Sequence, residues 1–405
     1  MVLTLFPRLK FTGRARRISL PTVVLFLLGF LLWMANFPNL DAHFPRPFFT
    51  ATEAGISSTV VSDSDATALE VAQNIYMLSL PARFDRRARM EILRKALGLQ
   101  WTYVDALPGT NELTQRIWEW VMRVRDGKPI ILNPNDNSHD RPSLGQVRFS
   151  WPDHIDQLAV SLSPIDFWAH TVWSTPILVH NPAPYRPTGC AMDDYRILNF
   201  SVELPEHLIL TRARIACWYS HVSVLHKIAN NKHQDLDSTY IILEDDIDME
   251  KDISQRLASL WKSLPSDWDM VFLGHCWSNE ETHPPLPNVY SQASNEGKNS
   301  SFAKPVRTIH RLHPSFKPKC THAYAISKGG ARRLLLHLRY PPFAYSRAID
   351  QAIAWLIEQG RIKSYTVIPS LVIQTKTDLS DIAPGNGNDW GAQLEDGVLG
   401  GRLSV

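Results

Sequence analysis

The sequence predicts an α/β protein with a mainly parallel sheet flanked by helices, preceded by one transmembrane helix. Short apolar runs rich in strand-forming residues alternate with helical segments between residues 74 and 374. This alternation is typical of parallel sheets covered by helices. A separate uncharged run at 18–37 is long enough to cross the ~30 Å hydrocarbon core of a bilayer. No internal repeat is present.

The N-terminal segment predicts an uncleaved membrane anchor. Basic residues precede the apolar run (Arg8, Lys10, Arg14, Arg16 and Arg17), and such a flank stays in the cytosol. A cleaved signal peptide is the alternative, but the run is long for one and no small-residue cleavage site follows. We expect a single-pass type II protein of the Golgi or endoplasmic reticulum membrane. The predicted parts are a cytosolic tail (1–17), the anchor (18–37), a stem (38–70), a lumenal globular domain (71–380) with an insertion (about 108–205), and a C-terminal tail (381–405).

The globular part opens with a strand–helix–strand unit. Residues 74–80 form a short apolar run, and residues 101–107 form a second one. Between them, the apolar residues of 85–99 recur every three or four positions, and Gly98 supplies a stop. This order predicts a βαβ unit.

The rest of the chain contains two irregular stretches. Residues 108–205 are rich in Trp and Pro, which predicts an insertion with one or two short helices, and 278–304 reads as a polar loop. We expect Ser346 to cap the last helix. The other predicted elements are helices at 211–231, 252–262, 328–338 and 346–360, strands at 239–246, 269–275 and 321–327, and a broken strand at 364–374.

Composition excludes few functions, and the four cysteines suggest a crosslink. The chain is 44% hydrophobic and 20% charged with a net charge of +2, so we expect no nucleic-acid partner.

An oxidising lumen allows three full pairings of the four cysteines. Cys276 ends one predicted strand and Cys320 precedes another, so their Cα atoms can meet the ~5.5 Å that a disulfide needs. We predict a Cys276–Cys320 bond, with Cys190 and Cys217 free or paired together.

Three carboxylates follow the apolar strand that ends at Leu243. Glu244, Asp245 and Asp246 are adjacent, and their mutual repulsion is relieved if a cation lies among them. Hard ions such as Mg²⁺ and Mn²⁺ prefer carboxylate oxygen. A solvated acidic turn is the alternative interpretation.

Five segments together resemble glycosyltransferase family 25, the lipooligosaccharide and collagen galactosyltransferase family. In chain order they read NIYMLSLPARFDRR, ACWYSHVSVLHKI, YIILEDDIDME, THAYAISKGGARRLLLHL and AIDQAIAWLIEQGRIKSYTVIPSLVIQ. They cover most of residues 74–374 and follow the order of the family. The chain looks like a fungal-type, membrane-anchored member. It departs from the bacterial pattern in its insertion, its anchor, and Ser79 and Pro81.

The resemblance implies a GT-A type fold and a metal-dependent transferase. The expected donor is a UDP-sugar, often UDP-galactose, and the expected cofactor is Mn²⁺ or Mg²⁺. The acceptor would be a glycan or glycoprotein. Asp245 and Asp246 are then the expected metal ligands, whereas Glu244 orients the strand end or holds a ligand water. The metal would neutralise charge on the departing phosphate.

The remaining candidate residues each have a structural alternative. Arg83 and Arg86 suit phosphate or uridine, or they belong to a solvated first helical turn. Ser220 and His221 would bind donor phosphate or ribose, or pack in the interior. His322 would contact donor or metal, or serve as a core histidine.

Asp350 is the predicted catalytic base, since inversion at a sugar carbon needs a base on the acceptor hydroxyl. Its alternative role is to complement a helix dipole.

Two rival functions follow from the same residues. A nucleotidyltransferase-like enzyme would use the carboxylates on a nucleoside triphosphate, but the chain has no Gly-rich phosphate loop. A non-catalytic lumenal protein that binds a nucleotide or glycan is the other alternative, and the intact run from Glu244 to Asp246 argues against it.

Overall fold

The computed structural model describes residues 69–125, 151–169, 187–191, 200–287, 308–375 and 394–400. All of them belong to one compact unit, Ser62–Val405. The predicted anchor at 18–37, the tail before it and nearly all of the stem lie outside these residues. Within the described part of the chain, no helix has both the length and the apolar character needed to cross a membrane.

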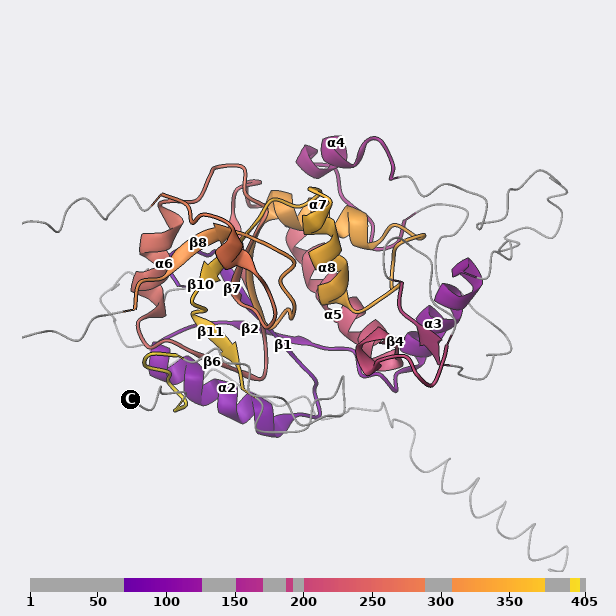
Figure 1. The fold of residues 1–405 in the computed structure, drawn as a ribbon, viewed down its shortest axis with the longest axis horizontal. Helices are drawn as coiled ribbons and strands as arrows, with labels where there is room; N and C mark the ends of the chain where they lie inside the picture. The colour runs from indigo at the N-terminus through magenta and orange to yellow at the C-terminus, as the bar shows by residue number, and fades with distance from the viewer. Residues whose placement is uncertain are drawn as a thin grey trace, which may run out of the picture. The chain divides into compact units, whose positions relative to one another are not determined.

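A seven-stranded sheet forms the centre of the described fold (Figure 1). The strand order is β2-β1-β5-β9-β7-β10-β8. Their bounds are β1 (Asn74–Ser79), β2 (Thr102–Asp105), β5 (Thr239–Glu244), β7 (Met270–Gly274), β8 (Arg311–Pro314), β9 (Ala323–Ser327) and β10 (Ser364–Ile368). β1 pairs in parallel with β2 and β5, and β7 with β10. Only β9 and β8 run in the opposite direction, so the predicted mainly parallel sheet is confirmed.

Helices cover both faces of this sheet (Figure 1). The helices α5 (Arg212–Ala229), α7 (Lys328–Leu338) and α8 (Ile349–Glu358) lie on one face, and α2 (Phe84–Leu97) and α6 (Ile253–Trp261) on the other. Tyr76 and Leu78 of β1 belong to the first core, whereas Ile75 and Met77 belong to the second. Because successive strand residues point to opposite faces, the central strands are buried on both sides, which explains their continuous apolar runs.

The insertion contains a longer helix than predicted. Helix α3 (Glu112–Arg125) has fourteen residues, and the whole turn from Ile117 to Val121 is buried. The insertion also contains a short helix α4 (Ile155–Val160) and the strand β3 (Thr188–Gly189), which pairs with β4 (Ile209–Leu210) just after it.

Several short elements were not predicted. These are β8, β6 (Ile247–Met249) and the 3-10 helices η1 (Glu206–Leu208) and η2 (Glu280–Thr282). The predicted broken final strand is confirmed: β10 stays in the main sheet, and β11 (Val372–Gln374) pairs with β6. The predicted Ser346 cap is wrong, because α8 begins at Ile349 with Ala348 as N-cap and no side-chain cap.

The predicted disulfide is confirmed. Cys276 and Cys320 are bonded with a Cα–Cα distance of 5.7 Å, which fits the geometry expected of neighbouring strand ends. Cys190 and Cys217 are free thiols, so the alternative in which they pair with each other is not observed.

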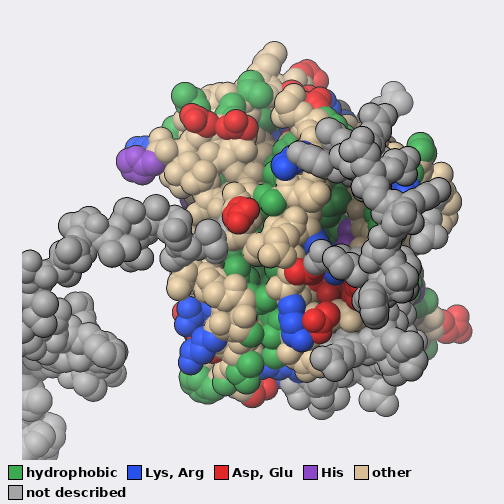
Figure 2. All heavy atoms as spheres, turned by 90° about the vertical axis from the view of Figure 1, so that its left-hand side faces the viewer, with side chains coloured by type: hydrophobic (Ala, Val, Ile, Leu, Met, Phe, Trp, Pro, Cys, Tyr) green, Lys and Arg blue, Asp and Glu red, His purple; other side chains and the backbone are tan. Residues whose placement is uncertain are grey.

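The described surface in Figure 2 mixes both signs of charge. Acidic and basic side chains are interspersed on this face, and no extended patch of one sign is visible among its described residues. The mixture agrees with the small net charge of +2. This face therefore supplies no strong field for attracting a polyanion.

Candidate functional site

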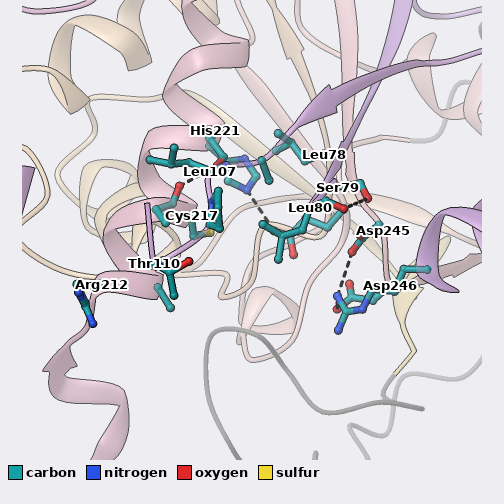
Figure 3. Close-up of a pocket in the computed structure, with 18 of the residues that line it drawn as sticks. Leu78, Ser79, Leu80, Leu107, Thr110, Arg212, Cys217, His221, Asp245 and Asp246 are labelled. Atoms are coloured by element: carbon teal, nitrogen blue, oxygen red, sulfur yellow. Dashed lines mark hydrogen bonds and ion pairs between the residues drawn. The ribbon is translucent and has the colours of Figure 1, made fainter. Parts of the chain in front are cut away.

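The carboxyl ends of three neighbouring parallel strands surround one pocket. β1 ends at Ser79, β2 at Asp105 and β5 at Glu244, and ligands of open α/β sheets bind beyond this edge. The pocket has a volume of about 580 Å³ and is lined by the loops after these strands and by the N-terminal half of α5. Figure 3 shows Asp245 and Asp246 toward one side of the pocket, and Thr110 and Arg212 toward the other.

Arg86 joins the two aspartates. It lies in the first turn of α2, which follows β1 and therefore starts at the same edge of the sheet. Its Nη1 donates to Asp245 Oδ1 at 3.0 Å and to Asp246 Oδ2 at 3.2 Å. The three side chains are only 8–14% exposed, so this cation offsets the repulsion between the carboxylates with little screening by water. Arg86 was predicted to contact donor phosphate or uridine, or to lie in a solvated first turn; in this structure it is bonded to the two carboxylates.

Glu244 has a separate set of partners. Its Oε1 accepts hydrogen bonds from Thr321 Oγ1 at 2.8 Å and from His221 Nε2 at 3.2 Å. Because an ionised carboxylate can only accept, Nε2 carries a proton, and His221 Nδ1 shares a 3.0 Å hydrogen bond with the Tyr324 hydroxyl. Burial alone would raise the pKa of Glu244, but the interactions with His221 and Thr321 outweigh it and lower the pKa. Its neighbours therefore hold Glu244 ionised and fixed in place.

Asp246 is the least satisfied of the three carboxylates. Its Oδ2 accepts from Arg86 and from Gln374 Nε2, the latter at 3.1 Å. Its Oδ1 is buried and has no hydrogen-bond partner among the described residues. Burial and the negative charges of Glu244 and Asp245 raise the pKa of Asp246 to about 7 despite Arg86. One oxygen of Asp246 is thus ready to accept a ligand.

Ser220 and His221 line the pocket from α5. Ser220 Oγ accepts from the backbone N–H of Leu107 at 2.9 Å and donates to the carbonyl of Ala216 at 2.8 Å. His221 is held between Glu244 and Tyr324. The structure brings both predicted residues to the pocket, with their polar atoms already bonded to the protein.

Arg83 and His322 do not line this pocket. Arg83 forms an ion pair with Asp85 at 3.0 Å beside the first turn of α2. His322 precedes β9, is 1% exposed, and has its Nε2 3.4 Å from the carbonyl of Val372. The geometry of His322 is that of a core histidine.

Asp350 is linked to the carboxylates through the segment 320–321. Its Oδ2 accepts from the backbone N–H of Cys320 at 3.1 Å. The next residue, Thr321, donates to Glu244, so the two carboxylates hold adjacent residues of one segment. After burial, Glu244 and Asp350 are the charges that most raise the pKa of the pocket thiol Cys217. Asp350 therefore acts electrostatically on the pocket without lining it.

Other pocket residues were missed by the sequence analysis. They are the loop 106–110 after β2, residues 211–213 at the start of α5, Cys217 and Gln374. The end of the predicted strand 101–107 was the available signal, because it had to lie at the same edge of the sheet. Gly109 lets the loop approach α5, since a Cβ there would lie 3.2 Å from Ala213 Cα.

The Asp245–Asp246 pair fits a divalent cation. Its donors are all oxygens, as Mn²⁺ and Mg²⁺ prefer, and the buried Oδ1 of Asp246 lacks a partner. Glu244 stands apart, because the three carboxylates are not gathered within 4.8 Å of one another. Among the described residues that closeness is found for Cys276, Cys320 and His322, and there the two sulfurs are bonded to each other.

A family comparison covers the second part of the site. Residues 194–352 match the model of glycosyltransferase family 25, described as an LPS biosynthesis protein. The match includes the three carboxylates and Asp350 and supports a relation to this family, which implies glycosyltransferase activity. It does not include β1, α2 or β2, and so leaves out Arg86. No curated protein matches the chain.

Proposed function

We propose that this protein is a metal-dependent glycosyltransferase that transfers a sugar, galactose as the first candidate, from a UDP-sugar to a glycan or glycoprotein acceptor. The observation that carries the proposal is the Asp245–Asp246 pair at the carboxyl end of β5, inside a pocket of about 580 Å³. Such a volume suits a nucleotide-sized ligand. The match to family 25 spans this pair.

Asp245 and Asp246 would hold the metal, Mn²⁺ or Mg²⁺. When bound, the metal supplies charge neutralisation for the departing diphosphate. Glu244 positions the end of β5 through its bonds to His221 and Thr321. Ser220 and His221 would contribute the α5 side of the donor site, from the positions that they occupy in the pocket wall.

Asp350 is the proposed base. In an inverting transfer, the acceptor oxygen bonds to the anomeric carbon, the bond from that carbon to the phosphate oxygen breaks, and the acceptor proton passes to the base. Asp350 lies at the N-terminus of α8, and its Oδ2 bonds the backbone N–H of Cys320, which precedes the Glu244 partner Thr321. Asp350 does not line the pocket, so the support for this role is its closeness to the segment that holds Glu244 and its electrostatic effect on the pocket thiol Cys217. Arg83 and His322 would act only indirectly on the donor.

The activity is tested with a set of UDP-sugars. We expect Mn²⁺-dependent release of UDP from one of them, and loss of this release in Asp246→Asn. If the protein binds UDP with Mn²⁺ in calorimetry but releases UDP from none of the sugars, with or without glycan acceptors, the non-catalytic nucleotide-binding alternative is supported instead. Absence of both binding and release contradicts the proposal.

We also propose that the catalytic domain is lumenal and that 18–37 anchors it as in a type II protein of the Golgi or endoplasmic reticulum. The uncharged run and the five basic residues before it support this topology. In sealed microsomes, the domain should resist protease until detergent is added. Digestion without detergent would contradict the topology and leave the enzymatic proposal standing.

A further inference from the structure

One nitrogen of Arg86 holds the place of a cation between Asp245 and Asp246. Nη1 lies 3.0 Å from one carboxylate and 3.2 Å from the other. A metal ion such as Mg²⁺ binds carboxylate oxygens at roughly 2.1 Å. An ion bridging the same two oxygens would therefore overlap the space that Nη1 takes, and the two cations cannot hold this position together.

We propose that Arg86 is an internal counter-ion that competes with the divalent cation for Asp245 and Asp246, and that it turns to the donor diphosphate when the cation binds. The inference rests on the proposed function. Arg86 lines the pocket, so its guanidinium can reach a ligand by rotating its side chain. A planar guanidinium is well suited to two phosphate oxygens.

This exchange couples the two ligands. Alone, the divalent ion must displace a partner that is 11% exposed and bonded to both carboxylates, so it binds weakly. With a diphosphate present, the displaced guanidinium gains a new anion. Each ligand then raises the affinity for the other, as linkage requires.

Calorimetric titration of the full chain in detergent tests the coupling. The titrants are Mn²⁺ alone, UDP alone, and Mn²⁺ in the presence of UDP. In Arg86→Gln, we expect Mn²⁺ alone to bind at least tenfold more tightly than in the wild type, because a positive charge has left the site. The gain in Mn²⁺ affinity caused by UDP should shrink by at least fivefold. Arg87→Gln is the matched control, since Arg87 bonds Ser79 and Asp105 instead, and it should bind Mn²⁺ like the wild type.

A second measurement uses the wild type and so does not depend on how Arg86→Gln folds. Modification of Arg86 by phenylglyoxal, followed by peptide mass spectrometry, should speed up when Mn²⁺ is added and slow down again when UDP is added as well. The inference is overturned if Arg86→Gln binds Mn²⁺ no more tightly than the wild type, or if Mn²⁺ does not change the rate of Arg86 modification. Either result leaves the metal site itself standing. If Mn²⁺ binds no variant even with UDP, the inference and the metal-dependent function both fail.

Discussion

Glu244 and Asp246 are both carboxylates, but their surroundings shift their pKa values in opposite directions. Hydrogen bonds from His221 and Thr321 lower the pKa of Glu244 against its burial. Asp246 has one unpartnered oxygen, and its pKa rises to about 7. Two carboxylates that are two residues apart therefore divide into a fixed structural group and a group suited to binding a ligand.

Replacing Asp246 by Asn should stabilise the metal-free protein at neutral and higher pH. Because the folded-state pKa lies above the ordinary 3.8, ionised Asp246 costs stability above about pH 7, and the cost is absent below about pH 4. We expect Asp246→Asn to gain up to about 4 kcal/mol at pH 8 and almost nothing at pH 4. Urea denaturation with a chelator at both pH values measures this.

The same variant should lose transferase activity by ~10²–10³ because a charge is missing opposite the departing phosphate. Asp105→Asn serves as the control, since the Asp105 side chain is 70% exposed, and it should change stability little. A variant that is active at saturating Mn²⁺, or less stable than the wild type at pH 8, would contradict the role of Asp246.

The carboxylates could be predicted from sequence, but their division of roles could not. Three acids after a buried apolar strand are visible in one short segment. The groups that distinguish them come from far along the chain: Arg86 lies 159 residues from Asp245, Gln374 lies 128 from Asp246, and Thr321 lies 77 from Glu244. No local pattern indicates which distant side chain meets which acid.

At the scale of elements, Arg332 of α7 connects the insertion to the core. The side chain is 2% exposed and donates to four backbone carbonyls, at distances of 2.8–3.0 Å (Leu158, Ala159, Ser163 and Ala229). Leu158 and Ala159 lie in the last turn of α4, and Ala229 ends α5. These are carbonyls that a helix leaves without an internal partner.

Arg332→Met should therefore destabilise the protein by about 3–5 kcal/mol, because several buried carbonyls lose their donor at once. Chemical denaturation measures the loss, and limited proteolysis should show faster cleavage between 151 and 169. Arg311→Met is the control and should be nearly neutral, because Arg311 is the exposed residue of the edge strand β8. Equal stability of the two variants would show that Arg332 does not hold α4 in place.

The disulfide joins two elements beside the site and closes a loop of 44 residues. In the chain-entropy model such a crosslink contributes about 4 kcal/mol, by restricting the unfolded chain. We expect the double variant Cys276→Ala, Cys320→Ala to lose a comparable amount in urea denaturation without reductant. Adding reductant should lower the wild type toward the variant and leave the variant unchanged. If the reductant does not alter the stability of the wild type, and the double variant is as stable as the wild type, the crosslink does not contribute to stability.

Elements were predictable where burial imposes a regular pattern. The central strands β1, β5 and β7 are apolar in their interiors because both faces are covered. β8 has only four residues with mixed polarity and pairs along one edge with β10, so its pairing is decided by the sheet and not by its own sequence. The length of helix α3 was not predicted for another reason: residues 117–121 are all buried, so the buried positions do not follow the three-to-four spacing of an amphipathic helix.

On the scale of the whole molecule, histidines packed around the central sheet have lowered pKa values. His337 of α7 is 2% exposed, and its ring packs 4.7 Å from that of Trp151 in the core beside α5 and α7. Burial lowers the pKa of His337 to about 4, and burial does the same for His275 at the end of β7. Protonating either imidazole therefore costs the folded state stability, whereas the unfolded chain protonates it at about pH 6.5.

The fold should therefore be sensitive to acid. Since the folded-state pKa of His337 lies below its unfolded value, its contribution is fully present above about pH 6.5 and is lost as the pH falls toward 4, by about 3 kcal/mol. Asp246 changes stability in the opposite direction, so the test compares variants with the wild type at each pH.

His337→Gln keeps a donor for the Arg333 carbonyl that His337 Nδ1 contacts at 2.8 Å, but its side chain cannot titrate. The variant should be less stable than the wild type at pH 7.5 because it loses the ring contact with Trp151, and this deficit should shrink by about 3 kcal/mol at pH 4. His233→Gln, at an exposed position, should follow the wild type at every pH. A deficit of His337→Gln that stays constant from pH 7.5 to 4 would show that His337 does not govern the acid response.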